Sequence, residues 1–198
     1  MKKLIIGVDI DGVLANFNVA FAKLLQKLSG RTLVDPESIN PTEWHWPQAI
    51  GYTSKEIDAC WRDIQTSSGF WAGLAPLPNV SYFLWALKRS AHDVYFATAR
   101  PGLSAKHQTE VWLAHHGYSL PTVLITEQKW VIAKALKFDA YIDDNRGNCL
   151  DVALTGGTRV YMPRAGYNRG EVGRVVEIGN IMEMLDAEHI VYDEKVAA

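Results

Sequence analysis

Short apolar runs alternate with amphipathic stretches along the chain, and this alternation predicts an α/β fold. Residues 4–10 are mostly apolar and rich in β-branched side chains, so we expect a buried strand that ends at Gly12. Similar runs predict four further strands. They cover residues 93–98, 122–129, 139–145 and 158–163.

Helical spacing of apolar residues fills the intervals between these runs. Helices are predicted at residues 17–30, 79–91 with Asn79 as N-cap, 104–116, 128–136, 147–154 and 175–185. Strands that alternate with helices imply a Rossmann-like parallel sheet with helices on both faces. We expect residues 192–198 to fray.

Residues 35–73 interrupt the alternation, because they are rich in proline and aromatic side chains. We interpret them as part of a small, mainly helical cap inserted after the first strand. The predicted division is a catalytic core of residues 1–16 and 78–198 and a cap of residues 17–77. A chain of 198 residues suits one such domain with an insertion.

Composition excludes several classes of protein. A formal net charge of −2 argues against extended nucleic-acid binding, which usually requires a basic surface. No apolar run approaches the ~18 residues of a membrane span, and Asp9 and Asp11 interrupt the apolar start of the chain. Cys60 and Cys149 alone form no disulfide framework, so we expect buried thiols and a cytoplasmic location.

Asp9 and Asp11 carry the strongest chemical signal. Side chains two residues apart on a strand share a face, so two carboxylates lie together at the C-terminal end of a buried strand. Like charges this close destabilise each other unless a cation or a shared proton intervenes, and Mg²⁺ prefers such oxygen ligands. A carboxylate can also attack phosphorus. Taken alone, the motif fits a plain Asp-Gly turn equally well.

The other predicted strands also end in polar groups. Thr98 ends the second strand, Lys129 follows the third, and Asp143 and Asp144 end the fourth. The carboxyl ends of parallel strands converge on one crevice, so these groups are expected to meet. Asp143 and Asp144 also fit a helix N-cap. The alternatives to Lys129 are two lysines that fall within or after the next helix, Lys134 and Lys137.

This order of motifs, over residues 4–167, resembles the haloacid-dehalogenase (HAD) superfamily of phosphohydrolases. Within it the chain most resembles the 5'(3')-deoxyribonucleotidases, through "DIDGVLANF", "GFWAGLAPLPNV", "ITEQK" and "YMPRAGYNRG". It departs from them at the second motif. That family usually has Thr-Ser or Ser-Ser there, often followed by Pro, whereas this chain has Thr98-Ala99-Arg100-Pro101.

We assign roles on this basis. Asp9 is the predicted nucleophile, and Asp11 the acid that protonates the leaving oxygen and then the base that activates water. The phosphate-binding residues are Thr98, Ala99 and Lys129. The metal-binding residues are Asp9, Asp143, Asp144 and, as the resemblance implies, the main-chain carbonyl of Asp11.

Aromatic side chains in and near the expected cap bear on the substrate, because a nucleobase needs a flat apolar wall. Each of them also fits a core position within the cap. Arg100 either binds a phosphate or a second anion, or forms a surface salt bridge. The candidate substrate-binding residues are Phe17, Trp44, Trp46, Phe70, Trp71 and Arg100.

The sequence thus predicts a magnesium-dependent phosphomonoester hydrolase that forms an aspartyl-phosphate. The expected substrate is a (deoxy)ribonucleoside 5'-monophosphate. Alternatives are a sugar phosphate or a nucleic-acid 3'-phosphate end. The intact set of polar strand ends argues against a non-enzymatic binding protein, and a homo-oligomer is left open.

Overall fold

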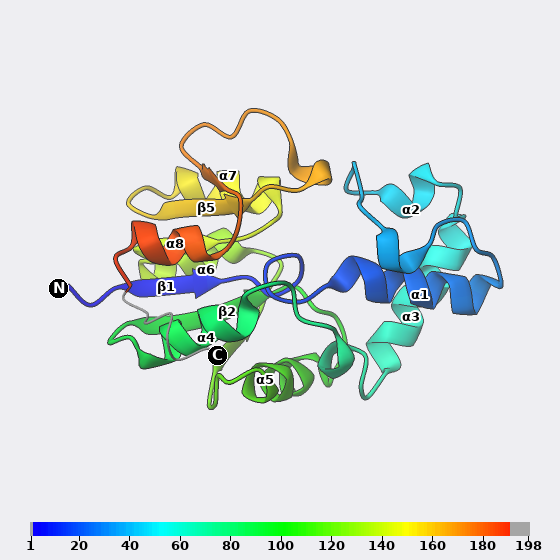
Figure 1. The fold of residues 1–198 in the computed structure, drawn as a ribbon, viewed down its shortest axis with the longest axis horizontal. Coiled ribbons are helices and arrows are strands. Elements are labelled where there is room, and N and C mark those ends of the chain that lie inside the picture. The colour runs from blue at the N-terminus through cyan, green and yellow to red at the C-terminus, as the bar shows by residue number, and fades with distance from the viewer. Residues whose placement is uncertain (1, 191–198) are drawn as a thin grey trace.

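The computed structural model describes residues 2–190, and its centre is a six-stranded parallel sheet in the order β3-β2-β1-β4-β5-β6 (Figure 1). The sheet confirms the predicted α/β class. Its strands are β1 (Ile5–Val8), β2 (Asp93–Thr98), β3 (Thr122–Ile125), β4 (Ala140–Ile142), β5 (Arg159–Pro163) and β6 (Val176–Ile178).

Helices cover both faces of the sheet, as the alternation predicted. On one face lie α4 (Val80–Arg89), α5 (Ala105–His115) and α8 (Met182–Ala187), whose apolar side chains join the main core. On the other face, α6 (Lys129–Leu136) and α7 (Arg146–Leu154) form a separate apolar cluster around Phe138 and Tyr141. None of the helices within residues 2–190 has the length and apolar character that a membrane crossing requires.

A group of helices between β1 and β2 lies beyond one end of the sheet (Figure 1). We call it the helical insertion, residues 17–73. Its first helix begins and ends at recognisable caps: the Asn16 side chain accepts a hydrogen bond from the Val19 N–H, and Gly30 ends that helix with φ 68°. The elements of the insertion are α1 (Phe17–Ser29), η1 (Pro36–Ser38), α2 (Trp46–Ala49), α3 (Ser54–Thr66) and η2 (Trp71–Gly73).

Two chain segments join the helical insertion to the sheet, and they pair with each other. The Asn16 N–H donates to the Ala75 carbonyl at 2.8 Å, and the Leu77 N–H donates to the Leu14 carbonyl at 2.7 Å. The entry to the insertion and the exit from it are therefore held side by side next to the end of β1.

The C-terminal part of the fold differs from the prediction. Residues 175–185 do not form one helix: Val176–Ile178 is β6, which pairs in parallel with β5, and α8 begins only at Met182. The run Val175-Val176-Glu177-Ile178 has β-branched residues that suit an edge strand, and Gly179 then breaks it. Residues 192–198, expected to fray, lie outside the described residues.

The start of α4 also differs in detail. Asn79 does occupy the N-cap position, but with φ 67° and no capping hydrogen bond from its side chain. Asparagine suits this position because its backbone adopts the left-handed region more readily than that of most residues.

Gly7, in the middle of β1, provides a test of this packing. A Cβ at Gly7 would lie 2.2 Å from Phe138 Cε2 and 2.8 Å from Tyr141 Cδ2, and both rings are buried. We expect Gly7→Ala to lower the free energy of unfolding by about 1–3 kcal/mol through overpacking. Urea unfolding measures this, with Gly69→Ala as control, because a Cβ at Gly69 meets no atom within 4 Å. Equal stability of the two variants would contradict the described packing.

Candidate active site

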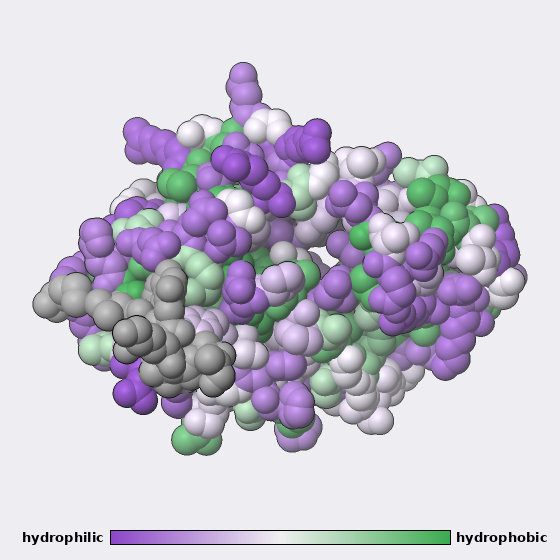
Figure 2. All heavy atoms as spheres, in the orientation of Figure 1, coloured by the Kyte–Doolittle hydropathy of each residue, from purple (hydrophilic) through white to green (hydrophobic). Residues whose placement is uncertain are grey.

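A cavity of about 460 Å³ lies between the carboxyl ends of the strands and the helical insertion. Figure 2 shows a hollow between these two parts of the molecule. The sheet side of the cavity is polar and the insertion side is largely aromatic. Its lining includes Asp9, Asp11, Thr98, Lys129 and Asp144 from the first and Phe17, Trp44, Trp46, Trp61 and Trp71 from the second.

Asp9 lies one residue beyond β1, and its backbone continues the sheet by donating from its N–H to the Ile142 carbonyl at 2.9 Å. The residue is 4% exposed, and its Oδ1 lies 2.6 Å from Lys129 Nζ. Burial raises the pKa of Asp9 well above its usual value, and neighbouring carboxylates raise it further, while Lys129 opposes them. The carboxyl group is thus held in a place that favours an additional cation.

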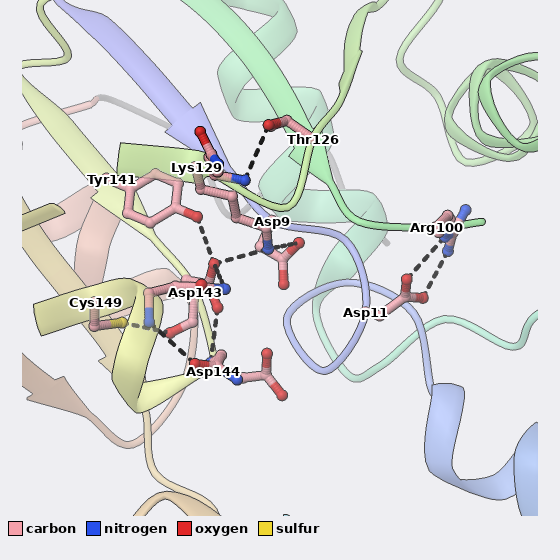
Figure 3. Close-up of polar contacts among 12 residues, drawn as sticks. Asp9, Asp11, Arg100, Thr126, Lys129, Tyr141, Asp143, Asp144 and Cys149 are labelled. Atoms are coloured by element: carbon pink, nitrogen blue, oxygen red, sulfur yellow. Dashed lines mark hydrogen bonds and ion pairs between the residues drawn. The ribbon is translucent and has the colours of Figure 1, made fainter. Parts of the chain in front are cut away.

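Lys129 and Asp143 form the centre of the polar network (Figure 3). Lys129 Nζ donates to Asp143 Oδ2 at 2.8 Å, and the Tyr141 hydroxyl and Asn148 Nδ2 donate to the same oxygen. The Asn145 N–H donates to Asp143 Oδ1 at 2.7 Å. Burial alone would lower the pKa of Lys129, but Asp143 and Asp9 raise it above its usual value, so the ammonium group keeps its charge.

Asp144 is held from the loop that follows β5. The Tyr167 hydroxyl donates to Asp144 Oδ2 at 2.6 Å, and Asn168 Nδ2 donates to the Asp144 carbonyl at 2.9 Å. Gly12 permits Asp144 to lie close to the loop after β1, because a Cβ at Gly12 would lie 1.9 Å from Asp144 Oδ2. Burial, and then the charge of Asp143, raise the pKa of Asp144 to about 7.

Asp9, Asp143 and Asp144 together could hold a metal ion. Each offers a carboxylate oxygen, and these oxygens all lie within 4.8 Å of one another. Lys129 is bound to two of the three carboxylates, so its single positive charge leaves the group with an excess of negative charge. An all-oxygen, anionic donor set of this kind fits a hard divalent cation such as Mg²⁺.

The carboxylate of Asp11 lies apart from this group and points to Arg100 (Figure 3). Arg100 Nε donates to Asp11 Oδ2 at 2.9 Å, and Arg100 Nη2 donates to Asp11 Oδ1 at 2.8 Å. The Arg100 side chain is fully buried, whereas the sequence allowed either an anion-binding residue or a surface salt bridge. Its salt bridge is an interior one. A metal contact through the Asp11 carbonyl stays a prediction.

The predicted phosphate-binding residues lie at the end of β2 and the start of α6. Thr98 is buried, Ala99 is exposed, and both line the cavity together with Lys129. The alternatives to Lys129 lie elsewhere: Lys134 and Lys137 are exposed and are absent from the cavity lining.

Four of the five predicted aromatic residues line the cavity, and they differ in exposure. Trp46 and Trp71 are 6% and 2% exposed, and their indole N–H groups donate to Asn18 Oδ1 and the Pro101 carbonyl. Trp44 is 50% exposed and makes an edge contact with Tyr167. Phe70 does not line the cavity; it packs edge-on against Phe17 and Trp71.

Sequence reasoning missed several residues of the site. Tyr141 precedes Asp143 by two residues and so shares its face of β4, a signal that alternation carries. Tyr167 lies within the motif "YMPRAGYNRG", which is its one signal in the sequence. Phe21 and Trp61 line the cavity from α1 and α3, and no local pattern separates them from ordinary core positions.

Comparisons with known proteins identify the family of this chain. Residues 3–184 match the sequence model of the family described as "5' nucleotidase, deoxy (Pyrimidine), cytosolic type C protein". A Bacillus cereus protein named "Putative nucleotidase" is 26% identical over 188 residues, which is 89% of this chain and 97% of that protein.

Solved structures share the fold at low sequence identity. One is a HAD family hydrolase from Deinococcus radiodurans R1 with bound phosphate and sodium (TM-score 0.61, 13% identity, 96% of this chain and 99% of that one). Another is described as a predicted phosphatase from Clostridium acetobutylicum (TM-score 0.61, 13% identity, 95% and 99% of the two chains). The resemblance to HAD phosphohydrolases is confirmed, and the chain belongs to the family of 5' nucleotidase, deoxy (Pyrimidine), cytosolic type C proteins.

Proposed function

We propose that this phosphatase is a magnesium-dependent 5'-nucleotidase that works through an aspartyl-phosphate on Asp9. The observation that carries the proposal is the position of Asp9. It lies between a buried lysine and two further carboxylates, on the floor of a cavity whose opposite wall is aromatic. The family description names a cytosolic protein, which supports the cytoplasm as its location.

Asp9 is the proposed nucleophile. One of its carboxylate oxygens attacks the phosphorus, and the bond between phosphorus and the leaving oxygen breaks. Lys129, 2.6 Å from Asp9 Oδ1, offsets negative charge on the nucleophile and on the transferring phosphoryl group. Thr98 and Ala99 line the cavity together with Lys129, which supports them as the residues that would donate hydrogen bonds to phosphoryl oxygens.

Asp11 moves the protons. In the first step its carboxyl group gives a proton to the leaving oxygen. In the second step its carboxylate takes a proton from water, the water oxygen attacks phosphorus, and the bond from phosphorus to Asp9 breaks. The side chain of Asp11 is 23% exposed and lines the cavity, which leaves it accessible to both oxygens.

Asp9, Asp143 and Asp144 would hold the magnesium ion, with the Asp11 carbonyl as a further ligand. When bound, the ion supplies Lewis-acid stabilisation of the negative charge that the reacting phosphoryl group carries. Asp143 is fixed by its donors Lys129, Tyr141, Asn145 and Asn148, and Asp144 by Tyr167, so the carboxylates are oriented before the ion arrives.

The aromatic wall supports a nucleoside as the organic part of the substrate. Trp44 is half exposed at the cavity, and Phe17 lines it beside Trp71, with ring centroids 5.9 Å apart. Base–aromatic stacking is worth about 1–3 kcal/mol per base in strand-binding proteins. The base is remote from phosphorus, so its binding energy can align the phosphate and hold the insertion over the site as a cap.

Removal of the metal provides one test. We expect chelation to abolish phosphate release, because three buried carboxylates then face the substrate with only Lys129 to offset them. Added Mg²⁺ should restore turnover, whereas Ca²⁺ should occupy the site and support turnover poorly, since its coordination is looser and higher. Phosphate release under each condition gives the answer. Full activity after exhaustive chelation would exclude a metal-dependent reaction.

The substrate class is tested by comparing a nucleoside 5'-monophosphate with ribose 5-phosphate in the presence of Mg²⁺. We expect a kcat/KM at least about tenfold higher for the nucleotide, a factor that corresponds to about 1.4 kcal/mol of base binding. Trp44→Ala should narrow this gap, while Trp85→Ala, on α4 and away from the cavity, should leave it unchanged. A parent enzyme that treats both substrates alike would contradict the nucleotidase assignment and leave a general phosphatase of small phosphomonoesters.

A further inference from the structure

Arg100 lies in the second motif, where this chain departs from the related nucleotidases. Its main partner in the structure is the Asp11 carboxylate. We propose that Arg100 is a positioning residue that fixes the carboxylate of Asp11 for proton transfer. This inference rests on the proposed function, because it assigns to Arg100 a role in the acid–base step. It excludes direct binding of the substrate phosphate by Arg100.

Arg100 and Asp11 differ in burial. The Arg100 side chain is 0% exposed, whereas the Asp11 side chain is 23% exposed and lines the cavity. Arg100 also lines the cavity, but its side chain is buried and its guanidinium group is already bound to Asp11, so Asp11 is the more accessible member of the pair. The exposed carboxylate is therefore the group through which the pair meets a substrate.

The contact is bidentate, and it leaves Asp11 free to react. Arg100 Nε and Nη2 donate to different oxygens of Asp11, at 2.9 and 2.8 Å, so the guanidinium and carboxylate groups are held in one relative orientation. A carboxylate has about four acceptor positions, and the pair occupies two of them. The remaining positions are available to a leaving oxygen or to a water molecule.

The guanidinium group is itself anchored from two further directions. Arg100 Nη1 donates to Thr109 Oγ1 at 2.9 Å, and that hydroxyl donates in turn to the Ala105 carbonyl within α5. The ring of Trp71 covers the guanidinium at 4.8 Å from its Cζ. These packed contacts thus fix the orientation of the Arg100 guanidinium, which in turn fixes the orientation of the Asp11 carboxylate.

Asp11 lies in a tight loop after β1, in which the Gly12 N–H donates to the Ala15 carbonyl and the Leu14 N–H donates to the Ile10 carbonyl. These bonds hold the backbone, and the contact with Arg100 holds the side chain. The Asp11 carboxylate also lies apart from Lys129, the cation that pairs with Asp9 and Asp143 (Figure 3). Among the described residues, Arg100 is the one that forms an ion pair with Asp11.

Arg100→Lys tests the inference, because lysine keeps the charge but cannot make the bidentate contact. The readout is kcat/KM, which reports steps up to formation of the aspartyl-phosphate. A nucleoside monophosphate needs its leaving oxygen protonated, and p-nitrophenyl phosphate scarcely does. We expect the loss in kcat/KM to be at least about tenfold greater for the nucleotide, as part of a general-acid contribution of about 10²–10⁴.

The effect must also depend on Asp11. In an Asp11→Asn background, Arg100→Lys should cause no further loss on the nucleotide, because the group that it positions no longer transfers a proton. Thr109→Val removes the anchor and keeps the ion pair, so it should shift the substrate ratio in the same direction by a smaller factor. It also provides the test if Arg100→Lys fails to fold. Arg89→Lys, on the surface of α4, is the matched control.

Two outcomes would overturn the role of Arg100. One is an equal loss on both substrates, which would indicate a structural or binding effect. The other is a loss that persists in full when Asp11 is already asparagine. A parent enzyme that hydrolyses neither substrate with Mg²⁺ would instead overturn the proposed function, so the two failures are distinguishable.

Discussion

The buried contact between Lys129 and two carboxylates, Asp9 and Asp143, is the interaction on which the rest of the site depends. All three side chains are at most 5% exposed, so each charge has lost most of its hydration. One ammonium group cannot neutralise Asp9, Asp143 and Asp144 together. The surrounding donors, above all the hydroxyls of Tyr141 and Tyr167, are arranged to hold these carboxylates in place despite their mutual repulsion.

The parallel sheet makes this arrangement possible. β1 lies between β2 and β4, so Asp9, Thr98 and Asp143 reach the same edge from neighbouring strands, and α6 brings Lys129 there at its first turn. The chain leaves the sheet after β1, enters the helical insertion at Phe17 and returns beside residues 14–16, which places aromatic side chains over the same edge. The polar floor and the aromatic wall of the cavity thus follow from one topological feature.

Much of this arrangement could be predicted from the sequence, since buried strands are apolar runs and their polar ends stand out. Asp9, Lys129 and Asp143 lie in contact as that reasoning expected. What it could not provide is side-chain pairing across distant elements. Nothing near Arg100 indicates that Asp11, Thr109 and Trp71 surround it. The prediction of a helix over residues 175–185 is wrong at β6, because the apolar residues there satisfy both a helical and an extended pattern.

The aromatic residues show a second limit of prediction from the sequence. Phe70 and Trp61 are both partly buried, yet of the two only Trp61 lines the cavity. Trp61 stacks with Phe17, whereas Phe70 packs edge-on against Phe17 and Trp71. Trp44 is the best-exposed tryptophan of the cavity, whereas Trp46 and Trp71 line it with side chains that are almost fully buried. The sequence identifies where aromatics gather, and tertiary packing decides which of them a ligand can reach.

The central claim is that Asp9 forms a covalent bond to phosphorus, and chemical trapping tests it most directly. The enzyme is mixed with a nucleoside monophosphate and Mg²⁺, quenched during turnover, and treated with borohydride, which reduces an acyl phosphate to an alcohol. Peptide mass spectrometry then locates the reduced residue. The account predicts homoserine at position 9, dependent on substrate. Unmodified Asp9 in an enzyme caught during active turnover, or homoserine at another aspartate, would contradict it.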